Sequence, residues 1–350
     1  MNEGFILFLL KLAVKPCFLT GFLAGIFFHS VFVTTLRTRY ERENTSYPVL
    51  STGLRETLPK TILDYYYKDK SFELEPKVNR IPSRILCWIP VLNNNDTQLI
   101  RILKTYGRHC DKLFFISKSE NPSIAQVLAH HYERISPKDL WNQVHRGWYL
   151  ISRLYLHDFE WFIKLDPDSF FIPENFLQMI QFKNWQSDSL VYFGHTIYTD
   201  SKPNPRAMIN LGAGYGVSRA MLHELTPYFP NNSNSNIPKD KRCKDVLQWA
   251  EDLQFADCIH KVFPRFIPNS TKDKWNRETF LPSEPNSQMK MTWGEFAPWY
   301  WKGKDSRITN EGIHLLSSRP VIFHYLKKPQ WFYFLDHFIF DVCVDPYPTK

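Results

Sequence analysis

The sequence predicts an α/β domain built around a largely parallel β-sheet. From Arg84 onward, short apolar segments of strand length alternate with segments whose apolar residues recur at helical spacing. Such alternation is typical of parallel sheets, in which ligands bind at the carboxyl ends of the strands. The residues that follow each predicted strand are therefore the first place to look for a site.

The predicted elements follow one another without long interruptions. The expected strands are residues 84–91, 111–117, 160–166 and 190–197. The expected helices are residues 95–110, with Asp96 as a candidate N-cap, 136–156, and 173–180, with Pro173 at its start. The second helix carries one apolar stripe, because a spacing of three and four residues places side chains on one face. The stripe consists of Leu140, Val144, Trp148, Ile151 and Tyr155.

Composition excludes several classes of protein. Apolar residues make up 43% and charged residues 22%, which is typical of a globular domain and excludes a disordered or coiled-coil chain. The net charge of +8 indicates a generic basic surface or attraction of an anionic ligand. No zinc finger, RNA-binding aromatic motif or block of Lys and Arg is present, so nucleic acid is not an expected partner.

The N-terminal region differs from the rest. Residues 16–33 contain no charged side chain and would span about 27 Å as a helix, close to the thickness of a hydrocarbon core. A signal anchor, a cleaved signal peptide and a buried core helix are the three interpretations. The anchor is favoured because arginines follow where a cleavage site would be expected. We therefore expect a tail at 1–15, a transmembrane anchor in the lipid bilayer at 16–35, a polar stem at 36–80 and a folded domain at 81–350.

Six cysteines are present, and none forms a C-x-x-C pair, so a zinc site is not expected. Cys17 lies in the apolar segment. In an oxidising lumen Cys87–Cys110 and Cys243–Cys258 would be natural local bridges, with Cys343 left over; in a reducing compartment they would be small core residues. Four Asn-x-Ser/Thr sites, a weak signal by themselves, occur at Asn44, Asn95, Asn231 and Asn269.

Asp166-Pro167-Asp168 follows the third predicted strand. Two carboxylates separated by one residue at a strand end can face one divalent cation, and a bound diphosphate would complete its coordination. A solvated turn is the alternative, because Asp and Pro are frequent turn residues.

Three further motifs have both a chemical and a structural interpretation. The run 212–216, GAGYG, allows close approach of a ligand or tight packing of a strand, and its spacing is not that of a dinucleotide-binding fingerprint. Glu251 and Asp252 offer a general base or an exposed acidic pair on a helix. His324, between two aromatic residues, is a metal ligand or a structural histidine.

The order of these segments resembles glycosyltransferase family 31, in particular the animal core 1 β1,3-galactosyltransferases and their dedicated chaperone. The matching segments are RILCWIPV, KTYGRHCDKLFFIS, GWYLISRLYLHDFEWFIKLDPDSFFIPENF, YFGHT, GAGYGVSRAML, EDLQFADCI and VIFHYL, which span residues 84 to about 330. The resemblance implies a GT-A-type domain with a Rossmann-like, mostly parallel sheet in a single-pass type II membrane protein of the Golgi or ER, with the domain in the lumen. It also implies inverting transfer of galactose from UDP-galactose to N-acetylgalactosamine O-linked to Ser or Thr of a glycoprotein.

The resemblance implies roles for individual residues. Asp166 and Asp168 match the outer positions of the family's D-x-D, which holds Mn²⁺ against the UDP diphosphate, and His324 matches the late histidine of that metal site. Asp252 matches the base that deprotonates the acceptor hydroxyl, and Glu251 is the neighbouring candidate. The loop that lines the donor and acceptor cleft matches Gly212, Ala213, Gly214 and Tyr215. The family's disulfide positions match Cys87–Cys110 and Cys243–Cys258.

The chain also departs from the family pattern. Pro167 replaces the usual middle Asp, the adjacent cysteine pair near the C-terminus is missing, and segment 270–312 matches loosely. Acceptor identity is therefore the least constrained inference. Four aromatic residues in this segment could stack on the acceptor sugar or could pack within the protein: Trp293, Trp299, Tyr300 and Trp301. A homodimer is compatible with Cys343 and with the membrane segment.

Two alternatives to a core 1 enzyme remain. The chaperone relative has the same fold but lacks the acidic metal motif and the late histidine, so an inactive chaperone is the first alternative. Retention of both features together with Asp252 favours catalysis. The second alternative is a family enzyme that uses another UDP-sugar or another acceptor.

Overall fold

The computed structural model describes residues 83–91, 96–118, 120–129, 140–198, 207–209, 213–229, 241–243, 251–285, 316–317 and 319–341. The chain divides into two compact units, one of residues Asn79–His337 and one of Met1–Val78 with Phe338–Lys350. The predicted tail, anchor and stem lie outside the described residues. Within the described part of the chain, no helix is both long and apolar enough to cross a membrane.

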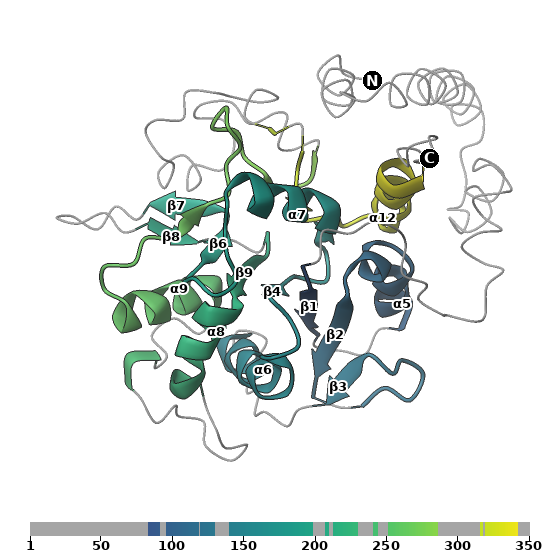
Figure 1. Cartoon of the computed structure of the whole chain (residues 1–350). Helices are drawn as coiled ribbons and strands as arrows, with labels where there is room; N and C mark the ends of the chain where they lie inside the picture. Colours follow the sequence, from purple (N-terminus) through teal and green to yellow (C-terminus); the bar gives the residue numbers. More distant parts are fainter. Residues whose placement is uncertain are drawn as a thin grey trace, which may run out of the picture. The chain divides into compact units, whose positions relative to one another are not determined.

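A seven-stranded sheet forms the centre of the unit Asn79–His337 (Figure 1). Its strands, in spatial order, are β10 (Asn269–Ser270), β6 (Tyr192–Gly194), β9 (Tyr215–Ser218), β4 (Trp161–Lys164), β1 (Ile85–Pro90), β2 (Lys112–Ser117) and β3 (Val127–Ala129). Neighbouring strands are parallel, except that β9 is antiparallel to both β4 and β6. The prediction of an α/β domain with a mostly parallel sheet is therefore confirmed.

The register of the sheet brings the predicted site to one edge. Trp88, Lys164, Tyr215, Gly194 and Ser270 pair with one another in a continuous row across five strands. Because β1, β4, β6 and β10 run in the same direction, the chain leaves all four at this edge, and antiparallel β9 begins there. This is the carboxyl edge at which ligands bind in such sheets.

Helices α6 (Leu140–Tyr155), α8 (Arg219–Leu225) and α9 (Glu251–Val262) pack on one face of the sheet (Figure 1). Alternate strand residues, including Phe162 and Tyr215, meet Trp148 of α6 and Phe255 of α9 in one apolar cluster. The other face packs against α7 (Pro173–Phe182), whose Phe176 ring centroid lies 5.8 Å from that of Trp161. α5 (Asp96–Lys104) packs beside α12 (Pro329–Asp336).

Short elements complete the unit. β5 (Phe170–Phe171) is antiparallel to β12 (Ile322–Phe323), which is parallel to β11 (Phe280–Leu281), and β7 (Thr196–Tyr198) is antiparallel to β8 (Ala207–Ile209). The remaining short helices of this unit are η1 (Tyr106–His109), η2 (Thr226–Tyr228) and η3 (Lys241–Cys243). A further short helix, η5 (His337–Asp341), begins at the last residue of this unit and otherwise belongs to the other unit.

The structure corrects two of the predicted elements and adds one strand. The expected strand 190–197 is divided at His195, with β6 in the central sheet and β7 in the hairpin with β8. The expected helix 95–110 ends at Lys104 and is followed by η1. Strand β9 was not predicted, because glycines at 214 and 216 weaken the strand signal of its two strand-favouring residues, Tyr215 and Val217.

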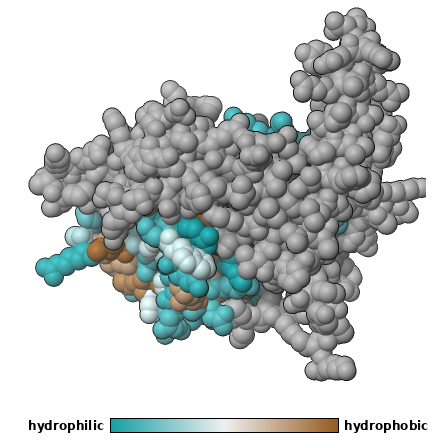
Figure 2. All heavy atoms as spheres, turned by 90° about the horizontal axis from the view of Figure 1, so that it is seen from above, coloured by the Kyte–Doolittle hydropathy of each residue, from teal (hydrophilic) through white to brown (hydrophobic). Residues whose placement is uncertain are grey.

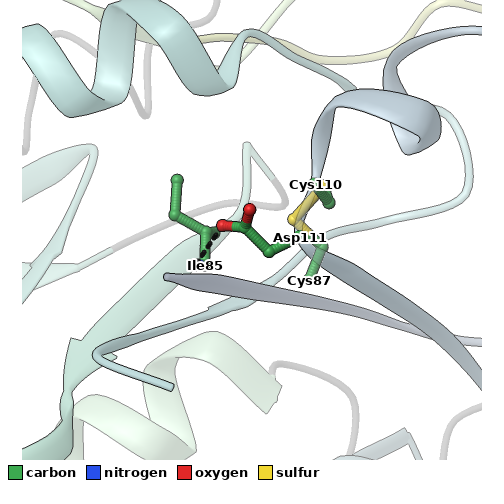
Figure 3. Close-up of a disulfide and its surroundings, with 4 residues drawn as sticks. All are labelled: Ile85, Cys87, Cys110 and Asp111. Atoms are coloured by element: carbon green, nitrogen blue, oxygen red, sulfur yellow. Dashed lines mark hydrogen bonds between the residues drawn. A yellow bond between two sulfur atoms is a disulfide. The ribbon is translucent and has the colours of Figure 1, made fainter. Parts of the chain in front are cut away.

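Two disulfides pair the cysteines that the family resemblance implied. Cys87 in β1 bonds Cys110 after η1, with Cα atoms 6.2 Å apart, and Asp111 Oδ2 beside it accepts a hydrogen bond from the Ile85 amide at 2.7 Å (Figure 3). Cys243 in η3 bonds Cys258 in α9, with Cα atoms 4.6 Å apart. These bonds hold the start of β2 against β1, and η3 against α9. Cys17 and Cys343 lie outside the described residues.

The described surface mixes hydrophilic and hydrophobic residues on the face shown in Figure 2. Large apolar side chains that are more than a third exposed belong to different helices and loops: Ile100, Leu154, Phe182, Leu190, Ile267, Trp275, Tyr325 and Phe334.

One of the four Asn-x-Ser/Thr sites, Asn269, lies in β10, where its Oδ1 accepts a hydrogen bond from the Tyr192 amide at 3.1 Å. The other three lie outside the described residues.

Substituting Gly216 with Ala should destabilise the domain. A Cβ at this position in β9 would lie 2.5 Å from Cζ of Phe193 and 2.7 Å from the Phe162 carbonyl oxygen, which belongs to the adjacent strand and cannot move away. We expect a loss of about 1–3 kcal/mol in the free energy of unfolding. Denaturant unfolding of the Gly216→Ala variant measures it. Adding Phe193→Leu should recover only part of the loss, and an unchanged unfolding midpoint for the single variant would contradict this packing.

Candidate active site

The Asp-Pro-Asp motif leaves the central sheet directly after β4. The Leu165 amide still donates a sheet-like hydrogen bond to the Trp88 carbonyl at 3.0 Å, and the chain then turns, with the Ser169 amide bonded to the Asp166 carbonyl at 3.0 Å. Asp166 and Asp168 are both partly exposed. The sheet therefore positions the start of the turn, and the turn presents two carboxylates at its carboxyl edge.

His324 reaches the same place from the far end of the chain. It follows β12, whose antiparallel pairing with β5 sets the segment after Phe323 against the Asp-Pro-Asp turn, and the Leu326 amide donates to the Asp168 carbonyl at 2.9 Å. His324 Nε2 lies 3.5 Å from Asp166 Oδ2 and 3.2 Å from Asp168 Oδ1. One ligand atom from each of the three residues lies within 4.8 Å of the others, so the predicted metal ligands are brought together.

Charge is concentrated at this cluster. Burial lowers the pKa of His324, but hydrogen bonds and charges from Asp166 and Asp168 outweigh it and raise that pKa to about 9. Burial raises the pKa of Asp166, but the charges of Lys164 and His324 outweigh it and hold that pKa well below its usual range. The two carboxylates thus favour a proton on His324, and His324 would release that proton when it binds a cation.

The donor set fits a divalent cation. Two carboxylates and one imidazole are ligands that suit Mn²⁺, since carboxylates bind hard divalent ions and imidazole binds first-row transition metals. Three side chains from one edge of the domain can bind the ion and still leave coordination positions for a diphosphate and for water.

Asp252 lies near this cluster in the first turn of α9. It is buried, and its Oδ1 accepts a hydrogen bond from the Leu253 amide at 2.8 Å. The ring centroid of Tyr325 lies 3.9 Å from that of His324, and burial raises the pKa of Tyr325. The charges of Asp168, Asp166 and Asp252 raise the pKa of Tyr325 further, so all three carboxylates are close enough to Tyr325 to influence its ionisation.

Glu251 is buried like its neighbour Asp252, but its carboxylate has different partners. Its Oε2 accepts a hydrogen bond from the Tyr215 hydroxyl at 2.7 Å, and its Oε1 forms an ion pair with Lys164. Burial raises the pKa of Glu251 to about 7 in spite of the lysine, with a contribution from Asp252. The two acidic residues that the sequence offered as alternatives therefore occupy different environments.

Lys164 is a site residue that the sequence reasoning missed. Its Nζ lies 2.5 Å from Asp166 Oδ1, contacts Glu251, and is 5.6 Å from the ring centroid of Tyr215. Burial lowers the pKa of Lys164, but the two carboxylates outweigh it and raise that pKa. A signal was present: Lys164 is a charged residue inside a strand that is otherwise apolar, two positions before Asp166.

The small-residue run packs against protein. Gly214 has a φ of +89°, and a Cβ there would lie 2.9 Å from both Ile322 Cδ1 and Leu165 Cδ2, so only glycine fits between β12 and the end of β4. Ala213 and Tyr215 are buried on either side of it. Gly212 and the aromatic candidates of segment 293–301 lie outside the described residues, and a donor-binding role for the run stays a prediction.

An α/β domain with three candidate metal ligands, two of them from Asp-x-Asp, at the carboxyl edge of its sheet is typical of enzymes that bind a phosphate-containing substrate through a divalent cation, a class that includes the glycosyltransferases. Known proteins agree with that class. The chain is 27% identical over 304 residues, 84% of its own length and 76% of the relative's, to glycoprotein-N-acetylgalactosamine 3-beta-galactosyltransferase 1 of Xenopus laevis. The predicted resemblance to such a galactosyltransferase is thereby confirmed, and the relationship supports a glycosyltransferase enzyme.

Two further comparisons add little to the identification of the protein class. No family model matches the chain. Among solved structures, a glycosyltransferase involved in the glycosylation of the major capsid of PBCV-1 is 12% identical, with a TM-score of 0.35, and the match covers 71% of this chain and 98% of that one.

Proposed function

We propose that this protein transfers galactose from UDP-galactose, with inversion and with Mn²⁺, to N-acetylgalactosamine O-linked to Ser or Thr of a glycoprotein or glycopeptide. The observation that carries the proposal is the convergence of Asp166, Asp168 and His324 within 4.8 Å at the carboxyl edge of the sheet. The relationship to a galactosyltransferase supports the choice of donor and acceptor. The domain would then have the GT-A architecture.

The proposed chemistry assigns a task to each group. Asp166, Asp168 and His324 would hold Mn²⁺, which supplies Lewis-acid stabilisation of the negative charge that develops on the UDP leaving group. The oxygen of the acceptor hydroxyl would bond the anomeric carbon on the face opposite the departing diphosphate. Asp252 would accept the proton of that hydroxyl as the bond forms. A single displacement of this kind inverts the anomeric centre and needs no covalent intermediate.

The proposal extends to cellular location. A luminal domain is consistent with the two disulfides, because such bonds persist in oxidising compartments. We therefore propose a single-pass type II protein of the Golgi or ER membrane, anchored in the bilayer by residues 16–35. Homodimerisation is part of the same expectation.

The test is a transfer assay with the purified full chain, UDP-galactose and a peptide carrying α-linked N-acetylgalactosamine, with Mn²⁺ or with EDTA. We expect transfer with Mn²⁺ and its loss with EDTA. A panel of UDP-N-acetylglucosamine, UDP-N-acetylgalactosamine and UDP-glucose serves as the donor control. Turnover of another donor would instead indicate a different family enzyme, and folded protein without turnover of any UDP-sugar would favour the chaperone.

A further inference from the structure

Lys164 is a buried cation at the end of a central strand. It has no exposed surface, and its backbone pairs with Trp88 on one side and Tyr215 on the other. Its side chain lies on the face of the sheet that α6 and α9 cover, because residues two apart in a strand share a face and Phe162 lies on that one. A lysine in such a position is retained only where carboxylates compensate for its lost hydration.

Two carboxylates from different elements do so. The ammonium contacts Asp166 Oδ1 at 2.5 Å in the Asp-Pro-Asp turn, and Glu251 Oε1 in the first turn of α9. Glu251 is held in turn by the Tyr215 hydroxyl at 2.7 Å, which accepts a hydrogen bond from Trp148 Nε1 at 3.4 Å. One continuous chain of polar contacts therefore links the turn, α9, β9 and α6.

This series of polar contacts determines how Asp166 faces the cation site. Lys164 occupies Oδ1 of the carboxylate, and Oδ2 points toward His324 Nε2 at 3.5 Å. The rotation of the carboxylate is thereby set, so that one oxygen remains for a cation. The same ammonium ties the turn to Glu251, the residue adjacent to Asp252.

We propose that Lys164 is a positioning residue that orients Asp166 toward the divalent cation and couples the Asp-Pro-Asp turn to the start of α9. The inference rests on the proposed function, because it assigns Lys164 to the same metal site. An ammonium has no acceptor with which to bind a cation, so Lys164 is not expected to be a ligand of the ion. It acts on Asp166, as groups outside the ligand sphere commonly orient metal ligands.

The test measures binding of Mn²⁺ alone to the full chain, by isothermal titration calorimetry and by the loss of the free-ion EPR signal. Lys164→Met keeps the length of the side chain and removes its charge, and we expect about 10- to 100-fold weaker Mn²⁺ binding. Lys164→Arg, which keeps the charge, should recover most of the affinity. Lys112→Met, which removes an exposed lysine from β2, is the matched control and should bind Mn²⁺ normally.

Lys164→Met leaves Glu251 buried without its counter-ion, and this alone can unfold the domain. The double variant Lys164→Met, Glu251→Gln removes both charges and restores folding, but Asp166 still lacks its ammonium. We expect the same weakening of Mn²⁺ binding in the double variant. Wild-type affinity in either folded variant would overturn the inference.

These readouts separate two failures. Mn²⁺ binding without galactose transfer would refute the proposed function and leave the role of Lys164 to be judged on affinity alone. If the wild-type chain bound no Mn²⁺, the metal site and the positioning role would both be wrong.

Discussion

Replacing Asp168 with Asn should lower kcat for galactose transfer by about 100- to 1,000-fold, which corresponds to about 3–4 kcal/mol of transition-state stabilisation. Asp168 is the better of the two carboxylates to test, because its side chain has no contact with Lys164. Its side chain is 35% exposed, and its Oδ1 lies 3.2 Å from His324 Nε2. Loss of its charge therefore weakens the cation site without leaving a buried ion unpaired.

Mn²⁺ titration of the transfer rate measures this effect, and the thermal unfolding midpoint of the Asp168→Asn variant should stay within a few degrees of wild type. Asp188→Asn is the matched control, since Asp188 is exposed after α7 and distant in sequence from the site. If Asp168→Asn kept the wild-type dependence on Mn²⁺, the Asp-Pro-Asp turn would not be the metal site.

Replacing Asp252 with Asn should lower kcat by about 10²- to 10⁴-fold, the usual contribution of a general base. Affinity for Mn²⁺ should not change, because Asp252 is not among the residues whose ligand atoms converge. The loss should therefore persist at saturating Mn²⁺, unlike that of the Asp168 variant. Steady-state kinetics at saturating Mn²⁺, beside direct Mn²⁺ binding, distinguish the two.

Glu251→Gln should behave differently from its neighbour. Glu251 is buried against Lys164 and Tyr215, so the substitution leaves a buried ammonium with one carboxylate fewer and destabilises the fold. Asp257→Asn, on the same helix and in a partly exposed pair with Lys261, is the control and should change neither activity nor stability appreciably. Full activity of Asp252→Asn with strong loss in stable Glu251→Gln would reverse the two roles.

Much of the fold could be predicted from local patterns. The alternation of apolar strand-length segments with helical spacing placed β1, β2, β4, α6 and α7 within a few residues of their observed bounds. The same reasoning fails for β9, because Tyr215 and Val217 alternate with Gly216 and Ser218 in a segment too short to mark a strand, and pairing with β4 and β6 decides its conformation. Phe193 and the Phe162 carbonyl lie so close to Gly216 that a larger residue would not fit between them.

The candidate site divides in the same way. The sequence predicts the residue types of the site and their order: Asp-x-Asp after an apolar strand, an acidic pair in an amphipathic segment, and a late histidine. The sequence does not predict that these residues converge, because His324 reaches Asp168 only through the pairing of β12 with β5. The contact of Lys164 with Glu251, 87 residues away, likewise depends on the packing of α9 against the sheet. The spacing of apolar residues along the sequence predicts which face of each helix or strand is buried. The partner of a buried charge depends instead on how the whole core packs.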